Sequence, residues 1–506
     1  MPSVVTHDLR VHNARSFVDS VNHDPEPGES EGMPRSYVFV GKPTEWAAGD
    51  NKPPVPTNSV QEYYQTYDEM LSLKRIRDLN CFLMIYRYPW VSGTIYDIYR
   101  HDYSQKNLAF SGADNLYDAV FYTINQYNDI YVCLNNFFNQ PSIDEPVSDG
   151  YEPFFTSDGY QWMKLYSVKQ QILFDYSTTN FIPITTDGVN LDNYERTFGE
   201  IITVVVDNPG SGFRLVTGTN SVEQVTNYFC KIVGDGEAAV ANVRLSGEGL
   251  NASVVDVRIA RSGSNYTFAE LDFRAYRVFR SLADLDANKN AIDPGGENFA
   301  STVIIGPQGG WGRDLPRLLG ATRVGVFSNF GSQTYDFFSD ATFRQIGILH
   351  DLEWNQDVVG ISPETLSACY AMTVNEVSGQ DTFIMGETIN QQVQDINGNT
   401  RLAKGTIVGY DEDEKILRYI VIPNISQAND GQIYPFELAG LIIGVDSGKT
   451  VEVRDFTGSE SNLTFVNGFA DSEVIHDTGY MTYLGNIQPV QREETQTERL
   501  SLIIQY

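Results

Sequence analysis

Apolar residues fall near helical spacing at the start of the chain. Between Asp8 and Val21 they occupy positions 9, 11, 14, 17, 18 and 21, which is the pattern of a helix with one buried face. Asp8 can accept hydrogen bonds from the free backbone N–H groups of a first helical turn. The pattern therefore predicts a short amphipathic helix over 8–21.

A strand and a second helix are predicted next. Residues 37–40 are β-branched and aromatic and are followed by glycine, as expected of a strand that ends in a turn. Prolines at 53, 54 and 56 exclude regular structure. Ser59 and Glu62 have the spacing of a capping box, in which each side chain satisfies a backbone donor near the other. We expect a helix from Ser59 to about Leu71.

Beyond residue 80 the dominant pattern is short runs of β-branched and aromatic residues between turn formers. Such runs predict strands. The fold class is therefore mainly β: an antiparallel β-sandwich core with a few short helices and two inserted small β modules. Strands are predicted at 81–88, 117–134, 162–168, 201–206, 322–330, 343–349 and 500–504.

The length predicts more than one domain, since a single hydrophobic core stops growing at roughly 250–300 residues and this chain has 506. Two segments, 202–213 and 255–268, each look like an alternating strand that ends in a glycine turn and an aromatic residue. With a strand at 238–243 they predict one β module over 201–275. Short runs at 405–410, 416–422, 438–445 and 450–456 predict a small sandwich or barrel over 355–470. The remainder, 1–200 with 276–354 and 471–506, is predicted to form one discontinuous core.

Charge limits the classes of partner. The chain has 66 acidic and 35 basic residues, a formal net charge of -31, so nucleic acid and anionic membranes are repelled. No window reaches the ~18 consecutive apolar residues of a membrane span, and the first ten residues lack the apolar run of a signal peptide. We expect no nucleic acid partner, no membrane insertion, and a protein that stays in the compartment where it is made.

The cysteines indicate no disulfide framework and no zinc site. Cys81, Cys133, Cys230 and Cys369 lie far apart and form no C-x-x-C pair. We expect four reduced, buried thiols. Aromatic residues are plentiful, with 29 Tyr and 28 Phe, and large aromatic side chains dominate the energetics of cores and interfaces.

Three segments resemble chemical motifs, and each has a simpler structural explanation. The run 444–450 has three residues between its glycines where a phosphate-binding P-loop needs four, so we predict a hairpin turn. The acidic run 411–414 lacks the glycine and the spacing of a calcium loop, so we predict a solvated hairpin tip. His350 stands next to acids but forms no H-E-x-x-H motif, so we predict a loop histidine. No catalytic residue, cofactor or metal is expected.

Six short motifs occur in the order found in one known family. They are 37–46 (YVFVGKPTEW), 53–60 (PPVPTNSV), 128–135 (NDIYVCLN), 158–166 (DGYQWMKLY), 343–349 (FRQIGIL) and 479–486 (GYMTYLGN), the last followed by similar residues at 489–490 and 496–498. Together they resemble the baseplate wedge subunit that T-even-type contractile-tailed bacteriophages encode in gene eight. The resemblance covers roughly 1–200, 300–350 and 470–506. Trp311 stands where some relatives have histidine in a glycine loop, so a purpose tied to that histidine is in doubt.

The resemblance implies a structural protein of the virion, located in the tail baseplate and in host cytoplasm during assembly. It implies a homodimer that docks onto other baseplate wedge proteins and rearranges with them when the tail contracts. Two alternatives stay open from the sequence. One is a tail-tip protein that binds host-surface glycan through the inserted β domains. The other, with no positive support in the motifs, is a cell-wall hydrolase.

Aromatic residues within the segments that the resemblance covers, the first of them about 35–65, are the candidates for subunit contacts, because aromatic side chains are enriched in interfaces. Core packing is the alternative for each of them. The candidates are Trp46, Tyr63, Tyr160, Trp162, Tyr480 and Tyr483.

Overall fold

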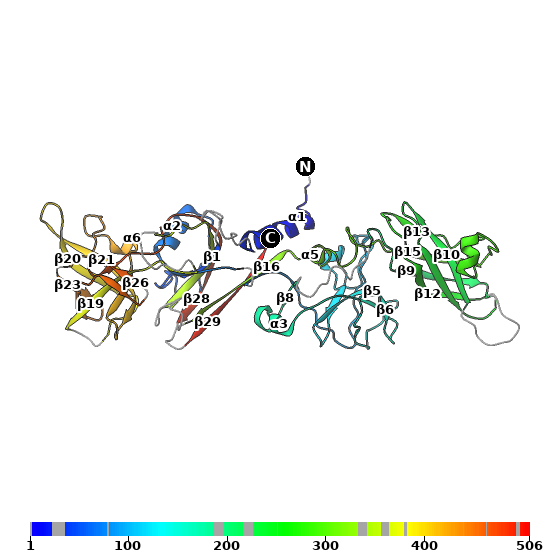
Figure 1. Cartoon of the computed structure of the whole chain (residues 1–506), viewed down its shortest axis with the longest axis horizontal. Coiled ribbons are helices and arrows are strands. Elements are labelled where there is room, and N and C mark those ends of the chain that lie inside the picture. The colour runs from blue at the N-terminus through cyan, green and yellow to red at the C-terminus, as the bar shows by residue number, and fades with distance from the viewer. Residues whose placement is uncertain are drawn as a thin grey trace. The chain divides into compact units, whose positions relative to one another are not determined.

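The structure is a computed structural model that describes residues 3–22, 36–77, 80–185, 197–215, 226–249, 251–331, 342–355, 364–378, 382–438, 440–461, 463–491 and 496–506. Strands account for 43% of the described residues and helices for 11%, in several antiparallel sheets, so the predicted mainly-β fold class is confirmed (Figure 1). The chain forms two compact units. Unit 1 contains 1–15, 82–324 and 505–506, and unit 2 contains 16–81 and 325–504. The three-part division predicted from the sequence stays a prediction.

A five-stranded antiparallel sheet lies at the centre of unit 2. Its order is β18-β2-β1-β17-β28, so the first predicted strand occupies the middle. Every residue of β1 is buried. The ring of Phe39 packs directly over Gly347 of β17, where a Cβ atom would approach the ring to 2.4 Å. The strands are β1 (Ser36–Gly41), β2 (Met70–Arg75), β17 (Thr342–His350), β18 (Thr365–Ser367) and β28 (Tyr480–Gln491).

Helix α2 (Val60–Asp68) precedes β2. The Oγ atom of Ser59 accepts a hydrogen bond from the backbone N–H of Glu62 at 3.2 Å, so the serine half of the predicted capping box is confirmed. The Glu62 carboxylate accepts the backbone N–H of Thr57 at 2.6 Å, where the capping box predicted that of Ser59. The predicted end at Leu71 is wrong, because Met70 and Leu71 already belong to β2. Both side chains are almost fully buried in the sheet, and this tertiary burial outweighs the local preference for another helical turn.

The second part of unit 2 is a closed barrel. Six strands pair in the cyclic order β19-β22-β21-β20-β23-β24 and back to β19, so the predicted sandwich or barrel is a barrel. Its interior is apolar, with Ile389, Ile407 and Val451 fully buried. The strands, drawn yellow to orange in Figure 1, are β19 (Tyr370–Ser378), β20 (Thr388–Gln394), β21 (Thr400–Asp411), β22 (Ile416–Ile420), β23 (Leu441–Gly444) and β24 (Thr450–Val453), with α6 (Pro423–Ser426), β25 (Gly458–Glu460), β26 (Leu463–Phe465) and β27 (Phe469–Ala470) beside them.

Unit 1 contains a four-stranded antiparallel sheet of order β4-β5-β7-β6. The strand predicted over 117–134 is interrupted, because Asn128 adopts a positive φ of 67° and makes the hairpin turn between β4 and β5. A short 3-10 helix, Leu116–Asp118, precedes it. The strands are β4 (Tyr122–Ile124), β5 (Asp129–Asn135), β6 (Phe154–Phe155) and β7 (Gln161–Ser167), and α3 (Gln170–Tyr176) and β8 (Phe181–Pro183) follow, with β8 pairing β3 (Cys81–Tyr86).

The rest of unit 1 is built from the segment predicted as an inserted module and the strand that follows it. The glycine turn predicted at 209–213 is wrong. Strand β9 continues through it and pairs with β15, because Gly210 and Gly212 adopt positive φ inside the ladder. The second glycine segment does end its strand, β12. The elements are β9 (Val204–Phe213), β10 (Thr226–Gly234), β11 (Val240–Ser246), β12 (Ser253–Arg261), β13 (Ala269–Leu271), β14 (Val278–Phe279), α4 (Leu282–Ala287), β15 (Gly295–Val303) and α5 (Leu315–Leu318).

Three further elements complete the fold: α1 (His7–Asn22), β16 (Arg323–Gly331) and β29 (Thr497–Gln505). The predicted N-terminal helix and C-terminal strand are therefore confirmed. All four cysteines are free and buried, as predicted.

Candidate functional site

The segment that resembles a P-loop holds one of the chain's own carboxylates. Glu387 is almost fully buried, and its carboxylate accepts hydrogen bonds from the backbone N–H groups of Asp446 at 2.8 Å and Ser447 at 2.9 Å, and from the Ser447 hydroxyl at 2.7 Å. Nζ of Lys449 lies 3.1 Å from Glu376. The predicted hairpin turn between β23 and β24 is confirmed. The loop amides that would bind a phosphate are already occupied.

The other two suspected motifs are structural as well. The acidic run is a hairpin tip between β21 and β22, as predicted, in which Oδ1 of Asp411 accepts hydrogen bonds from the next backbone N–H groups. The prediction of a loop histidine is wrong. His350 is the last residue of β17, buried, with Nδ1 2.5 Å from Oγ of Ser36 and the ring of Tyr480 stacked on it at 5.3 Å. Burial lowers the pKa of His350, so it is a neutral core residue at pH 7.

The described part of the chain contains no group of three or more His, Cys, Asp or Glu that could hold a metal ion. No helix in it is long and apolar enough to cross a membrane. Several of the matched motifs lie at one surface of unit 2, and this surface is the candidate functional site.

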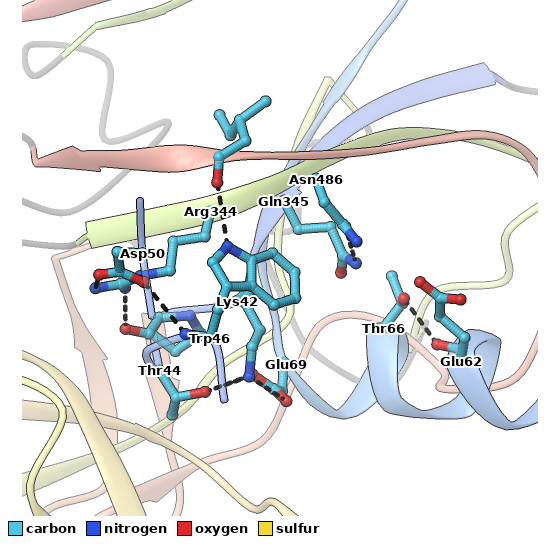
Figure 2. Close-up of polar contacts among 12 residues, drawn as sticks. Lys42, Thr44, Trp46, Asp50, Glu62, Thr66, Glu69, Arg344, Gln345 and Asn486 are labelled. Atoms are coloured by element: carbon cyan, nitrogen blue, oxygen red, sulfur yellow. Dashed lines mark hydrogen bonds and ion pairs between the residues drawn. The ribbon is translucent and has the colours of Figure 1, made fainter. Parts of the chain in front are cut away.

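The chain between β1 and α2, residues 42–59, has no helix or strand, yet it is firmly anchored (Figure 2). At its start Lys42 adopts a positive φ of 62°. Its Nζ lies 2.6 and 2.9 Å from the two carboxylate oxygens of Glu69, at the end of α2. Thr44 donates a further hydrogen bond to the same carboxylate at 2.9 Å. Both charged groups are largely buried, and a desolvated pair of this kind holds its geometry well.

A second anchor joins the segment to β17. Two guanidinium nitrogens of Arg344 donate to the two carboxylate oxygens of Asp50, each at 2.8 Å, and a third donates to the Pro43 carbonyl. The Asp50 carboxylate also accepts the backbone N–H of Trp46 at 3.2 Å. The hydrogen bonds from Arg344 hold the pKa of Asp50 below its usual value. This bidentate contact fixes the turn over 46–50 against the sheet.

A third anchor joins the segment to the outermost strand, β28. Nε1 of Trp46 donates to the Ile487 carbonyl at 3.2 Å, and Nδ2 of Asn486 donates to the Pro54 carbonyl at 3.0 Å. Asn486 in turn accepts a hydrogen bond from Gln345 at 2.8 Å. Side chains in Figure 2 thus connect three parts of the sequence, near residues 42–69, 344–345 and 486–487.

The anchored segment and the helix after it expose apolar side chains. Val60 and Tyr64 stand one turn apart on the same face of α2 and are 66% and 53% exposed. Val55, in the irregular segment, is 86% exposed. We call these three residues the α2 patch. Between 51 and 66 the only charged residues are Lys52 and Glu62, one basic and one acidic, and Glu62 accepts the backbone N–H of Thr57. The stretch 51–66 therefore has no net charge, while Lys42, Asp68 and Glu69 line the same surface hollow as Val60 and Tyr64.

The predicted contact residues fall into two groups. Trp46, Tyr63, Tyr480 and Tyr483 belong to unit 2 and keep exposed surface. Trp46 is in the anchoring network, and the Tyr63 hydroxyl donates to Asn58. Tyr480 and Tyr483 lie on β28.

Trp162, on β7, and Tyr160, which directly precedes β7, are fully buried in unit 1. Their rings stack with centroids 5.4 Å apart, and the Tyr160 hydroxyl donates to the Gln140 carbonyl. These two residues are therefore packed in the core, which was the alternative to a subunit contact for every candidate.

The α2 patch was not predicted, although the sequence contains a signal for it. The cap at Ser59 sets the helix phase and places Val60 and Tyr64 on one face. Asp50 and Arg344 were also missed, and the sequence gives no signal for that pair because 294 positions separate them.

Asp68, near the end of α2, provides a pH test of this region. Burial, together with the negative charges of Asp477 and Glu69, raises the pKa of Asp68 to about 6. The ionised form is therefore penalised in the folded state above pH 6, and the penalty disappears as the pH falls toward 3.8. We expect Asp68→Asn to raise the free energy of unfolding by about 1 kcal/mol at pH 8, a value reduced because the group is half exposed.

Chemical denaturation at pH 8 and pH 4 checks this expectation. The difference in stability between the variant and the parent chain should be much smaller at pH 4 than at pH 8 and should vanish at a pH well below 3.8, where Asp68 is protonated in both the folded and the unfolded state. Asp413→Asn, at the exposed hairpin tip, is the matched control. A stability gain that persists unchanged at pH 4 would contradict the assignment.

Comparison with known protein families finds no model that matches the chain, and comparison with curated proteins finds no significant relative.

Proposed function

We propose that this chain is a non-catalytic structural subunit of a phage tail baseplate wedge. It forms a homodimer and links neighbouring wedge proteins, in host cytoplasm during assembly and in the baseplate of the finished virion. The observation that supports this most is the α2 patch: exposed apolar side chains presented by a segment that is anchored at three places.

Anchoring matters because binding costs conformational entropy. A loop that must be ordered on binding loses part of its gross interaction energy, whereas a surface that is already fixed does not. The three anchors use a buried ion pair, a bidentate arginine contact and two hydrogen bonds to β28. An irregular segment is expected to have this many anchoring contacts where its surface must keep one shape.

The anchors also fall within the motifs on which the family resemblance rests. Lys42, Thr44 and Trp46 belong to the first motif, and Pro54 belongs to the second. Arg344 and Gln345 belong to 343–349, and Asn486 ends the motif 479–486. Four motifs from distant parts of the sequence therefore meet in one network in unit 2. Proteins that share this surface would all need these residues to lie together in the fold. This requirement supports the proposal of a baseplate wedge subunit.

Charge supports a second copy of the chain as one occupant of the α2 patch. Two copies that each have a net charge of -31 repel one another. They can approach where a surface has little charge, and residues 51–66 have a net charge of zero. An apolar, neutral patch can also be self-complementary across a twofold axis, which is the commonest symmetry of homo-oligomers.

Variants of the patch test the proposal. We expect Val60→Asp combined with Tyr64→Asp to convert the dimer to a monomer, since four aspartates would face one another across the twofold contact. Sedimentation velocity over a range of concentrations measures the change. Thermal unfolding should be almost unaffected, because both side chains are exposed.

Val466→Asp is the matched control, because Val466 is 60% exposed in the barrel of the same unit. That variant should remain dimeric. If the double variant and the control have the same mass as the parent chain, the α2 patch is not the contact between copies.

A further inference from the structure

Unit 1 contains a cleft with several exposed aromatic rings. Its volume is about 430 Å³, and its lining includes residues of β9 and β12, of the loop after β5 and of strand β6. Phe110, Phe137, Phe138 and Phe155 border it and are between 38% and 56% exposed. Exposed phenylalanine is unfavourable in water, so four rings around one cleft indicate a surface that is covered in use.

The backbone is strained where two of these rings are displayed. Phe137, Phe138 and Asn139 all adopt positive φ, at 47°, 61° and 59°, a conformation that non-glycine residues rarely take. Strain of this kind persists only where neighbouring groups enforce it, and it clusters at ligand-binding sites.

Hydrogen bonds enforce the conformation. Oδ1 of Asn135 accepts the backbone N–H of Phe137 at 2.8 Å, and Oδ1 of Asn136 accepts that of Asn139 at 3.1 Å. Gly159 lies under the ring of Phe137, where a Cβ atom would approach the ring to 2.8 Å. The rings are therefore held in place before any ligand binds.

Polar groups in the cleft keep unused hydrogen-bonding capacity. The guanidinium of Arg258 stacks over Phe155 at 4.9 Å, and its only hydrogen bond to a described residue runs from Nε to Asp256 at 3.4 Å. The side-chain oxygen of Asn135 already accepts a hydrogen bond, so its Nδ2 can still donate one. Nδ2 of Asn107 already donates, so the side-chain oxygen of Asn107 can still accept a hydrogen bond. The cleft thus offers donors and an acceptor between aromatic faces.

We propose that this cleft binds a neutral oligosaccharide. A sugar ring has apolar C–H faces that pack on aromatic rings, and hydroxyl groups at its edges that donate and accept hydrogen bonds. An aliphatic protein side chain would cover the rings but leave the polar groups unpaired, which costs free energy. The charged lining residues, Arg100 and Arg258 against Asp207 and Asp256, have no net charge, which favours a neutral sugar over an acidic one. This binding activity goes beyond the structural role and does not depend on it.

A printed array of neutral and acidic bacterial oligosaccharides, probed with the full chain, is the first experiment. We expect retention of neutral oligosaccharides, followed by saturation-transfer NMR signals from the retained sugar in solution. Phe137→Ala combined with Phe138→Ala, and separately Arg258→Gln, should each weaken binding at least tenfold. The phenylalanine variant should still fold, with a small loss of stability, because alanine does not add to the backbone strain and each ring is about half exposed.

The controls separate the cleft from the rest of the surface. Phe174→Ala, at an exposed ring on α3, and Arg261→Gln, on the same strand as Arg258, should bind as tightly as the parent chain. The variant with aspartate at 60 and 64 should also bind, whatever its oligomeric state. The proposal is overturned if no oligosaccharide is retained, if only acidic ones are, or if the cleft variants bind normally. Retention of an apolar peptide in place of a sugar would overturn it as well.

Discussion

Trp162→Ala is expected to lower the free energy of unfolding of unit 1 by about 3–5 kcal/mol, the usual cost of emptying a buried aromatic site. Trp162 has no exposed surface, and its ring lies 5.4 Å from the rings of both Tyr160 and Tyr96. Alanine would leave a cavity between these two tyrosine rings in one core cluster. Domains are stable by only about 5–15 kcal/mol, so much of the variant should be insoluble at 37 °C.

Urea unfolding, monitored by far-UV circular dichroism because this signal does not require Trp162, measures the loss of free energy of unfolding. Trp162→Phe should be much milder, because it keeps most of the ring volume and removes an indole N–H that has no partner among the described residues. Phe174→Ala, at an exposed ring of the same unit, should change stability by less than about 0.5 kcal/mol. Equal stability of the alanine variant and the parent chain would contradict the buried position of this ring.

Glu387→Ala is expected to lower the free energy of unfolding of the barrel by about 3 kcal/mol. The carboxylate accepts the backbone N–H groups of Ile384, Asp446 and Ser447. Removal would leave these three donors unsatisfied where water reaches them poorly, at about 1 kcal/mol each. The hairpin between β23 and β24 should become the least stable part of the barrel.

Hydrogen exchange of the amides at 446 and 447 gives the direct readout for this prediction. Their protection should fall sharply in Glu387→Ala and partly in Glu387→Gln, which keeps one acceptor oxygen. Glu452→Ala, at an exposed acid on β24, serves as the control and should leave exchange unchanged. Full protection of both amides in the alanine variant would show that the carboxylate does not hold the hairpin.

Much of the local structure could be predicted because local chemistry determines it. The cap at Ser59, the N-terminal helix and the hairpin at 411–414 depend on residues within a few positions of one another. The turn at 444–450 could be predicted as well, but Glu387, which holds its amides from about 60 positions away, could not. The predictions failed where residues far away in the sequence determine the local structure. Met70 leaves the helix because β1 pairs with it, and the glycines at 210 and 212 continue a strand because β15 lies alongside.

The barrel and the candidate site show the same limit on a larger scale. Alternation within 355–470 favours a sandwich or a barrel equally, and only the pairing of β19 with β22 closes the ring. In the site, the aromatic residues Trp46 and Tyr63 could be identified because they lie in a segment that resembles the family. The contacts of Trp46 with Ile487 and of Asp50 with Arg344 span 441 and 294 positions. A periodicity of two or 3.6 residues contains no information about such pairs.

The oligomeric mass of the purified chain in solution tests the central proposal most directly. Light scattering at several protein concentrations and two salt levels should give a stable mass near twice 56.7 kDa. Added salt should leave that mass unchanged, because the proposed contact is apolar and salt weakens the repulsion between the acidic copies. A mass of 56.7 kDa at every concentration and at both salt levels would contradict the proposed homodimer and with it the role assigned to the α2 patch.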